Sequence, residues 1–374
     1  MKRARDTAAA ATTSATPGNW RGRQCVVLKN DSITVMILTG GGHIISIEHS
    51  DAAGINPLWE PPWSAEATMD PSLRRLATEA GIAEPGEPEG ELLAGIGGIN
   101  FCCDVFGAHS AGEVKEGLSF HGEAGLATWE VDSWKDGKLT MTAHLQRSLL
   151  RCTREYSLDG EALLVSETVT NLASFERAMG RCQHVTIGEE FLGRGARCSF
   201  HARCDKGMTW PEDMDSDGAL CSQWEPATEF AYPHIPRRAR GGASGTDDWT
   251  QFPREGTPVS SDLATMRVDP TTEEGTCGVL RHGQGTTPAL HFTVKWERKA
   301  FPWLMTWEEN RARQGKPWNG RTLCRGLEIS SYAFATSRRD NVERGKLFGT
   351  PCFEWFDARE TKTTSFTFEL LSLG

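Results

Sequence analysis

The sequence predicts an all-β protein, a large antiparallel β-sandwich with few short helices. Three observations support this prediction: apolar and polar residues alternate along many segments, turn signals separate these segments at short intervals, and helix signals are scarce. Period-two alternation puts apolar side chains on one face of a strand and polar side chains on the other. Many such strands with few helices between them favour two antiparallel sheets packed face to face.

The clearest strands flank a turn near the N-terminus. Ile33, Val35 and Ile37 would share one strand face, three glycines at residues 40–42 supply a turn, and alternation resumes at residues 45–47. Two alternating segments around a glycine cluster are typical of a β-hairpin. Further strands are expected at residues 139–145, 163–169, 290–297 and 366–370.

Few segments have the pattern of a helix or a long loop. Asp70 would cap a helix whose first position is Pro71 and which ends at Gly81. Residues 84–90 alternate Glu, Pro and Gly and are expected to form a loop. Residues 205–262 are rich in Asp, Gly, Pro and Arg, so we expect a long insertion or a set of loops there.

The domain organisation is expected to be simple. Residues 1–19 are rich in Ala, Thr and Ser and predict a disordered tail. Strand signals continue from about residue 24 to the end, so residues 20–374 are expected to form one β-sandwich domain. The short apolar segment Ala8 to Ala11 is too weak for a signal peptide, and no segment reaches the roughly 18 apolar residues of a membrane span.

Charge and cysteine usage indicate the class of partner and the compartment. The formal net charge is -10, from 40 Lys plus Arg against 50 Asp plus Glu, which argues against nucleic acid or an anionic membrane as a partner. The eleven cysteines are odd in number and irregularly spaced, as expected for reduced thiols in the cytoplasm. We therefore expect a cytoplasmic monomer or homodimer that acts on a small molecule.

Tryptophan is the unusual component of the composition. The chain has 13 Trp against three Tyr. An indole is a broad apolar surface with one hydrogen-bond donor, and the C–H faces of sugar rings stack on such surfaces. Trp59, Trp63, Trp303 and Trp307 are candidate stacking platforms, although core packing is the commoner role of any single tryptophan.

Three ionisable residues stand in contexts that differ from an ordinary exposed strand position. His121 lies in a loop that contains Gly122 and Gly125, where the backbone can approach a ligand closely. His184 was expected at the start of an apolar strand, and Glu328 in the middle of another. An ionisable group in an apolar strand is either part of an ion pair or functional.

The sequence predicts neither a metal site nor a cofactor site. Cys198, His201 and Cys204 are residue types that bind zinc, but their two-residue spacings lack a matching second pair. Buried thiols on a strand and turn are the expected alternative. Glycine-rich dinucleotide motifs, phosphate loops and nucleophile elbows are absent from the sequence.

The ordered set of motifs resembles the aldose 1-epimerase (galactose mutarotase-like) family from about residue 24 to the end, with a C-terminal segment at 341–351 typical of a divergent bacterial branch. The motifs in order are Gly-Gly-His at 41–43, Asn-Pro-Leu-Trp-Glu at 56–60, Gly-Gly-Ile-Asn at 97–100, Leu-Ser-Phe-His-Gly at 118–122, Tyr-Ser-Leu-Asp-Gly at 156–160, Val-Thr-Asn at 169–171, Gln-His at 183–184 and Leu-Glu at 327–328. The resemblance implies a galactose mutarotase-like supersandwich whose concave face binds one sugar.

The resemblance also implies roles for the three ionisable residues in opening and reclosing a sugar ring, which interconverts its anomers. Glu328 would be the general base that removes the proton of the anomeric hydroxyl. His184 would be the general acid that protonates the ring oxygen, and His121 would hydrogen-bond the substrate. Strand alternation would place Glu190 on the face of His184, where its charge could raise the pKa of the imidazole.

Two further positions are candidates for substrate binding. Asn100 stands in for part of the Asn-Arg pair that precedes the first histidine in the family. Asp248, beside Asp247, is the candidate for the carboxylate that holds sugar hydroxyls.

Two alternatives to an anomer-interconverting isomerase are left open. Val185, Thr186 and Ile187 replace the Pro-aromatic segment that follows the second histidine in the family, which motivates a carbohydrate-binding protein without turnover. The same acid and base could instead catalyse elimination or isomerisation of an oxidised glycoside.

Overall fold

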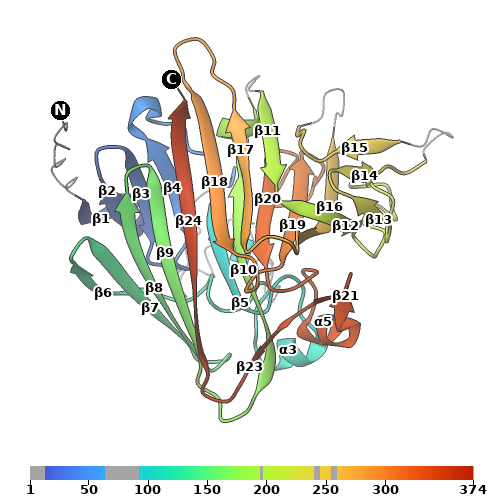
Figure 1. Ribbon diagram of the computed structural model, residues 1–374, viewed down its shortest axis with the longest axis horizontal. Coiled ribbons are helices and arrows are strands. Elements are labelled where there is room, and N and C mark those ends of the chain that lie inside the picture. The colour runs from blue at the N-terminus through green and yellow to red at the C-terminus, as the bar shows by residue number, and fades with distance from the viewer. Residues whose placement is uncertain are drawn as a thin grey trace, which may run out of the picture.

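Two large antiparallel β-sheets form the protein, which confirms the predicted all-β class (Figure 1). The structure is a computed structural model that describes residues 13–63, 92–93, 95–193, 197–239, 245–253 and 259–373. The expected helix at 70–81 and the expected loop at 84–90 lie outside these residues. Figure 1 shows the strands of the smaller sheet crossing in front of central strands of the larger sheet.

The larger sheet has 12 strands in the order β1-β2-β3-β4-β5-β10-β20-β19-β16-β12-β13, with β23 paired to β10 off this path. Its strands are β1 (Ser14–Trp20), β2 (Arg23–Lys29), β3 (Ile33–Leu38), β4 (Ile44–His49), β5 (Ile99–Asp104), β10 (Arg177–Ile187), β12 (Cys204–Thr209), β13 (Glu229–Ala231), β16 (Ser260–Val268), β19 (Trp303–Asn310), β20 (Leu323–Ser330) and β23 (Glu354–Phe356).

The smaller sheet has eight strands in the order β11-β17-β18-β24-β9-β8-β7-β6. Its strands are β6 (Glu130–Lys135), β7 (Lys138–Leu145), β8 (Leu150–Asp159), β9 (Ala162–Asn171), β11 (Cys198–Ala202), β17 (Glu274–Arg281), β18 (Ala289–Glu297) and β24 (Thr361–Leu373). Two small two-stranded sheets are formed by β14 (His234–Pro236) with β15 (Thr246–Asp248) and by β21 (Lys346–Leu347) with β22 (Thr350–Pro351).

Helices are short in the part of the chain that the structure describes, and none there is long and apolar enough to cross a membrane. They are the 3-10 helix η1 (Ser50–Ala52) and the α-helices α3 (Ala111–Lys115), α4 (Glu189–Leu192) and α5 (Arg338–Arg344). In Figure 1, α3 and α5 lie together at the end of the molecule where β21 and β23 also lie.

Most of the predicted strands are confirmed, and two expectations are wrong in part. The hairpin around the glycines at 40–42 is β3 paired antiparallel to β4. Residues 14–19 are not a disordered tail, because β1 pairs along its length with β2 at the edge of the larger sheet. Residues 205–262 are not only loops, since they include β13, β14 and β15. Their short strands pair locally, which turn-rich composition does not reveal.

The main hydrophobic core lies between the two sheets, and strand alternation decides which residues enter it. Val185 of β10 and Leu327 and Ile329 of β20 are fully buried members of this core. Because neighbouring side chains point to opposite faces of a strand, His184 and Glu328 project from the other face of the larger sheet. That face, away from the smaller sheet, carries the candidate site.

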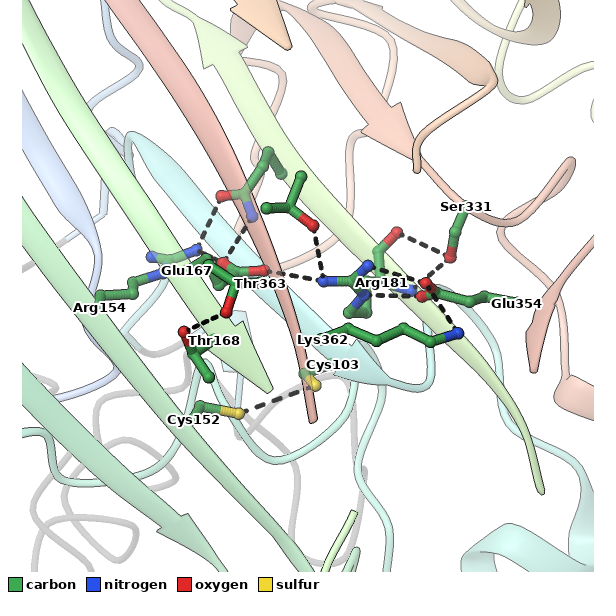
Figure 2. Close-up of polar contacts among 12 residues, drawn as sticks. Cys103, Cys152, Arg154, Glu167, Thr168, Arg181, Ser331, Glu354, Lys362 and Thr363 are labelled. Atoms are coloured by element: carbon green, nitrogen blue, oxygen red, sulfur yellow. Dashed lines mark hydrogen bonds and ion pairs between the residues drawn. The ribbon is translucent and has the colours of Figure 1, made fainter. Parts of the chain in front are cut away.

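A network of buried charges connects the sheets. Arg154 of β8 donates to Glu167 of β9 through Nη2 at 2.6 Å, and both side chains are completely buried. Gln183 of β10 accepts from Arg154 at 2.7 Å and donates to Glu167 at 2.8 Å. Arg181 of β10 lies 3.7 Å from Glu167 and donates to both carboxylate oxygens of Glu354, at 2.8 and 2.9 Å. Figure 2 shows Arg154, Glu167, Arg181 and Glu354 in this continuous arrangement.

Candidate active site

Pairing between β10 and β20 brings His184 and Glu328 together. The two residues are direct cross-strand partners in the antiparallel register. Directly opposed side chains on one sheet face are close enough to interact, and His184 Nε2 lies 3.3 Å from Glu328 Oε1. Both side chains are almost fully buried. His184 lies near the end of β10 and not at the start of a strand, because β10 begins at Arg177.

His121 reaches the pair from a tight loop. Its own φ is 62° and that of Gly122 is 80°, a left-handed backbone that favours glycine. A Cβ on Gly122 would lie 2.1 Å from the carbonyl oxygen of Cys103, so only glycine allows the loop to pack against β5. The His121 and His184 rings are 5.2 Å apart between centroids. Gly122, which the sequence suggested would let the backbone come close to a ligand, therefore lets the loop pack closely against β5.

A cavity of about 210 Å³ lies over these three residues. Four residues with ionisable side chains line it: His121, His184, Glu328 and Arg313. The other described lining residues are Trp59, Leu92, Leu93, Ile96, Gly107, Ala108, Phe120, Trp210, Met214, Leu263, Trp307, Trp318 and Ala335.

Three tryptophans form an aromatic wall of the cavity. The Trp59 and Trp318 rings are stacked, with an interplanar angle of 11° and centroids 6.2 Å apart. The Trp307 ring meets the Trp318 ring edge-on at 5.6 Å and lies 6.3 Å from the His184 ring. The Arg313 guanidinium lies over Trp307 and Trp318, at 5.6 and 5.0 Å from their centroids. The wall therefore extends from the histidine to an arginine that is itself held on the rings.

Burial shifts the pKa values of both members of the central pair towards their uncharged forms. It raises the pKa of Glu328 from 4.5 to about 8, and it lowers the pKa of His184 from 6.5 to about 4. In both cases the charged form is disfavoured because it is removed from water. At neutral pH the cavity therefore holds a protonated carboxyl beside a neutral imidazole, and the one titratable proton of the pair is on Glu328.

His121 is a neutral hydrogen-bond donor. The backbone N–H of Gly107 donates to His121 Nδ1 at 2.9 Å, so the ring proton is on Nε2. Burial, and then the neighbouring His184, lower the pKa of His121 well below its ordinary value. His121 can therefore donate one hydrogen bond from Nε2 at neutral pH without carrying a charge.

Thr186 holds the second nitrogen of His184. The Thr186 hydroxyl lies 3.1 Å from His184 Nδ1, two residues along the same face of β10. A hydroxyl can accept from a protonated Nδ1 or donate to a bare one, so this contact suits either tautomer. The ring orientation is fixed while its proton can change position.

Of the substrate-binding and stacking residues that the sequence suggested, Trp59 and Trp307 line the cavity and two others lie close to it. Trp63 packs edge-on against Trp59, at 5.4 Å, in the cluster behind the wall. Asn100 is the partner of His184 on β5 and is buried, and its Oδ1 has no hydrogen-bond partner among the described residues. Neither Trp63 nor Asn100 contributes to the described cavity lining.

The remaining three suggested residues lie elsewhere. Trp303 is fully buried in a separate cluster and donates to the carbonyl of Pro351 at 2.7 Å. Asp248 is exposed on β15. Glu190 does not share the strand face of His184, because β10 ends at Ile187 and Glu190 belongs to helix α4. The alternation argument for Glu190 is therefore wrong.

Several cavity residues were not identified from the sequence. Trp210 directly precedes Pro211, and Trp318 follows Pro317 in a loop that also carries Arg313. Loops have no side-chain periodicity, so no alternation pattern connects them with the strands of the site. The combination of proline and tryptophan in a turn was the available signal, because such a turn fixes a large ring outside a regular strand.

The candidate zinc motif does not assemble. Cys198 points into the main core and contacts the carbonyl of Phe191 at 2.6 Å, while His201 Nε2 lies 2.8 Å from His291 Nε2. Among the residues that the structure describes, no group of three or more His, Cys, Asp or Glu side chains could hold a metal ion. All eleven cysteines are described, and all are free thiols.

Comparison with known structures defines the class of fold as galactose mutarotase-like. A candidate aldose 1-epimerase from Klebsiella pneumoniae superimposes with a TM-score of 0.60 and 13% identity, over 95% of this chain and 82% of that one. A galactose mutarotase-like protein from Clostridium acetobutylicum superimposes with a TM-score of 0.57 and 12% identity, over 96% of this chain and 99% of that one. A candidate mutarotase from Salmonella typhimurium has a TM-score of 0.56 and 11% identity, over 97% of this chain and 98% of that one.

Searches with the sequence find no match, whereas comparison of the structures does. No protein-family profile matches the chain, and no curated protein sequence matches it. The predicted resemblance is confirmed as a structural match to aldose 1-epimerase and mutarotase-like proteins at low identity, and what is shared is the fold.

Proposed function

We propose that this protein is an aldose 1-epimerase-like isomerase that interconverts the anomers of a sugar. The observation that carries the proposal is the contact of 3.3 Å between His184 Nε2 and Glu328 Oε1 at the cavity. Anomer exchange needs one group that accepts a proton and one that donates a proton on either side of the anomeric centre. At neutral pH this pair has one carboxyl proton to transfer, on Glu328, and one acceptor position, on His184.

The reaction follows from the proton on the pair. Movement of that proton from Glu328 to His184 gives a carboxylate and an imidazolium. The carboxylate removes the proton of the anomeric hydroxyl while His184 protonates the ring oxygen, and the bond between the anomeric carbon and the ring oxygen breaks. The aldehyde that results rotates about its C1–C2 bond and recloses on the other face, which returns both protons. His121 Nε2–H would hydrogen-bond the sugar oxygens during these steps.

Apolar surroundings support the proposed chemistry. The indoles of the aromatic wall and Phe120 exclude water from the pair, which strengthens the interaction of developing charges with His121 and His184. The same surroundings keep the resting pair uncharged, so charge separation occurs only as the substrate is engaged.

A substitution at Glu328 tests the proposal. Glu328→Gln keeps the shape of the side chain but cannot carry the proton, so we expect the rate of anomer exchange to fall by about 10²- to 10⁴-fold. Exchange would be measured by polarimetry and exchange NMR over a broad panel of aldoses, with the spontaneous rate subtracted. The matched control is Glu189→Gln, an exposed carboxylate outside the cavity that pairs with Arg311.

Three results would contradict the proposal. Full exchange activity in Glu328→Gln would show that this carboxyl is not the proton carrier. Sugar binding by calorimetry without faster exchange in the unsubstituted protein would instead favour the carbohydrate-binding alternative. Cleavage of a keto-glycoside without aldose exchange would favour chemistry on an oxidised glycoside.

A further inference from the structure

We infer that the cavity is built for a sugar that carries an apolar, flat substituent away from its anomeric carbon, and not for a simple hydroxylated hexose. This inference specifies the substrate class of the site proposed above and rests on that proposal for the sugar part of the ligand. It is carried by the distribution of hydrogen-bonding groups over the cavity lining and by the aromatic wall.

Hydrogen-bond acceptors are scarce among the described lining side chains. Arg313 and the tryptophan indoles can only donate, and His121 Nδ1 already accepts from Gly107. Apart from the weak thioether acceptor of Met214, Glu328 and His184 are the remaining side-chain acceptors in the described lining, and both face the reacting carbon in the proposed mechanism. A hydroxylated ring presents an O–H donor on most of its carbons, so most of these donors would find no side-chain acceptor in the described lining.

Unpaired hydroxyls weaken binding. A hydroxyl that leaves water without a new partner loses about 10- to 100-fold in affinity. A hydroxyl that is absent, or replaced by an apolar group, avoids this loss and gains from burial of its surface. The described lining therefore discriminates against polar ring positions that lie far from the His184–Glu328 pair.

The aromatic wall is positioned to receive the apolar part. It starts 6.3 Å from the His184 ring at Trp307 and continues to Trp318, whose ring is stacked with Trp59. The three rings are buried within one hydrophobic cluster with Trp63, so they are held in place and need no reordering when a ligand binds. A flat group packs against indole rings better than an alkyl chain of equal size does.

Paired ligands test this inference. D-galactose and D-glucose would each be compared with the 6-deoxy sugar and the 6-O-benzyl ether, with Kd measured by calorimetry and by quenching of tryptophan fluorescence. We expect the benzyl ether to bind at least about 10-fold more tightly than its parent in one series, with the 6-deoxy sugar between them. Equal or weaker binding of both benzyl ethers, or binding of none of these probes, would overturn the inference.

Substitution of the wall locates the effect. Trp318→Leu should remove most of the advantage that the benzyl ether has over its parent sugar, measured as the ratio of the two Kd values in the same variant. Trp318→Phe, which retains a ring, should recover part of the advantage and guards against a folding defect in the first variant. Trp355→Leu is the control, because Trp355 is 45% exposed and lies outside the cavity lining. An unchanged preference in Trp318→Leu would refute the role of the wall.

The same complexes separate this inference from the proposed isomerase activity. Preferential binding of a benzyl ether without faster anomer exchange would contradict the isomerase and leave the substrate class standing. Rapid exchange of unsubstituted galactose or glucose, with no preference for the ethers, would support the isomerase and overturn the substrate class.

Discussion

At the scale of single residues, burial rather than sequence context decides the chemistry of the site. Glu328 and His184 have ordinary side chains in strands, yet removal from water raises the pKa of the carboxyl and lowers that of the imidazole, so both are uncharged at neutral pH. The two side chains are 3.3 Å apart, close enough for the proposed transfer of a proton between them.

The pair predicts a limited pH range for activity. Exchange should be fastest while Glu328 is protonated and His184 is neutral. This state lies between about pH 4, below which His184 becomes an imidazolium, and about pH 8, above which Glu328 becomes a carboxylate. The exchange rate, corrected for the spontaneous reaction at each pH, should therefore fall on both sides. A rate that continues to rise well above pH 8 would show that the ionised carboxylate is the resting base.

Stability should also depend on pH through Glu328. The unfolded chain loses this proton near pH 4.5, whereas the folded protein keeps it to about pH 8. The stabilisation is therefore complete below about pH 4.5 and is lost as the pH rises towards 8. Glu328→Gln cannot ionise, so its Tm relative to the unsubstituted protein should increase from pH 5 to pH 8.5. Calorimetry at both pH values measures this change, and a Tm difference that is the same at both pH values would contradict it.

At the scale of elements, β10 carries two functions on its two faces. Arg181 and Gln183 enter the buried charge network between the sheets, while His184 lines the cavity and Thr186, on the same strand face, contacts the His184 ring. The network holds the strand on the face towards the smaller sheet. The His121 loop packs against the neighbouring strand β5, where Gly122 pairs with Cys103. The site therefore depends on three backbone segments, which are β10, β20 and the His121 loop, and each is held by contacts outside the cavity.

The loop of His121 provides a test of this arrangement. Gly122→Ala should destabilise the protein by about 1–3 kcal/mol, because the backbone is left-handed and the new Cβ would overlap the Cys103 carbonyl. Anomer exchange should weaken as well, since the loop must move. Gly137→Ala is the control, with φ at 73° but open space around it, and should lose no more than about 1–2 kcal/mol. Equal losses of stability in denaturant unfolding would show that the close approach does not constrain the loop.

Sequence patterns predicted the strands and the central residues better than the periphery of the site. The β3–β4 hairpin follows from local alternation, and an ionisable group among apolar neighbours distinguished Glu328. Glu190 was misplaced because alternation does not indicate where β10 ends, and the helix that follows it is only four residues long. Trp318 and Arg313 were missed because a loop residue reaches the cavity through tertiary packing, which has no local periodicity.

At the scale of the whole molecule, the buried charge network ties the two sheets together. Burial alone would lower the pKa of Arg154, but Glu167 beside it raises that pKa overall, so the guanidinium stays charged in the core. Its charge also lies 4.3 Å from the centroid of the Phe101 ring on the opposite sheet. The interface between the sheets is thus partly polar, and its geometry is specified by directional bonds as well as by apolar packing.

Removal of one member of this network should be costly. Glu167→Ala leaves Arg154 and Arg181 buried without their shared carboxylate, so we expect a loss of about 3–5 kcal/mol in the free energy of unfolding. Glu167→Gln retains some hydrogen bonds and should lose less. The control is Glu369→Ala, which removes a partly exposed pair with Lys295 and should lose less than about 1 kcal/mol. Similar values for Glu167→Ala and Glu369→Ala in denaturant titrations would show that the network does not join the sheets energetically.

The alternation of β10 has a consequence for how this protein can evolve. His184, which lines the cavity, and Gln183, which joins the buried charge network, occupy adjacent positions, but their side chains lie on opposite faces. Substitutions at the cavity face can therefore change the groups that meet a ligand without removing a partner from the network, and substitutions at the other face can weaken the network without changing the cavity lining. Within its eleven residues, β10 thus keeps the positions that line the cavity apart from the positions that hold the sheets together. This separation suits a fold that is kept while its sequence diverges widely.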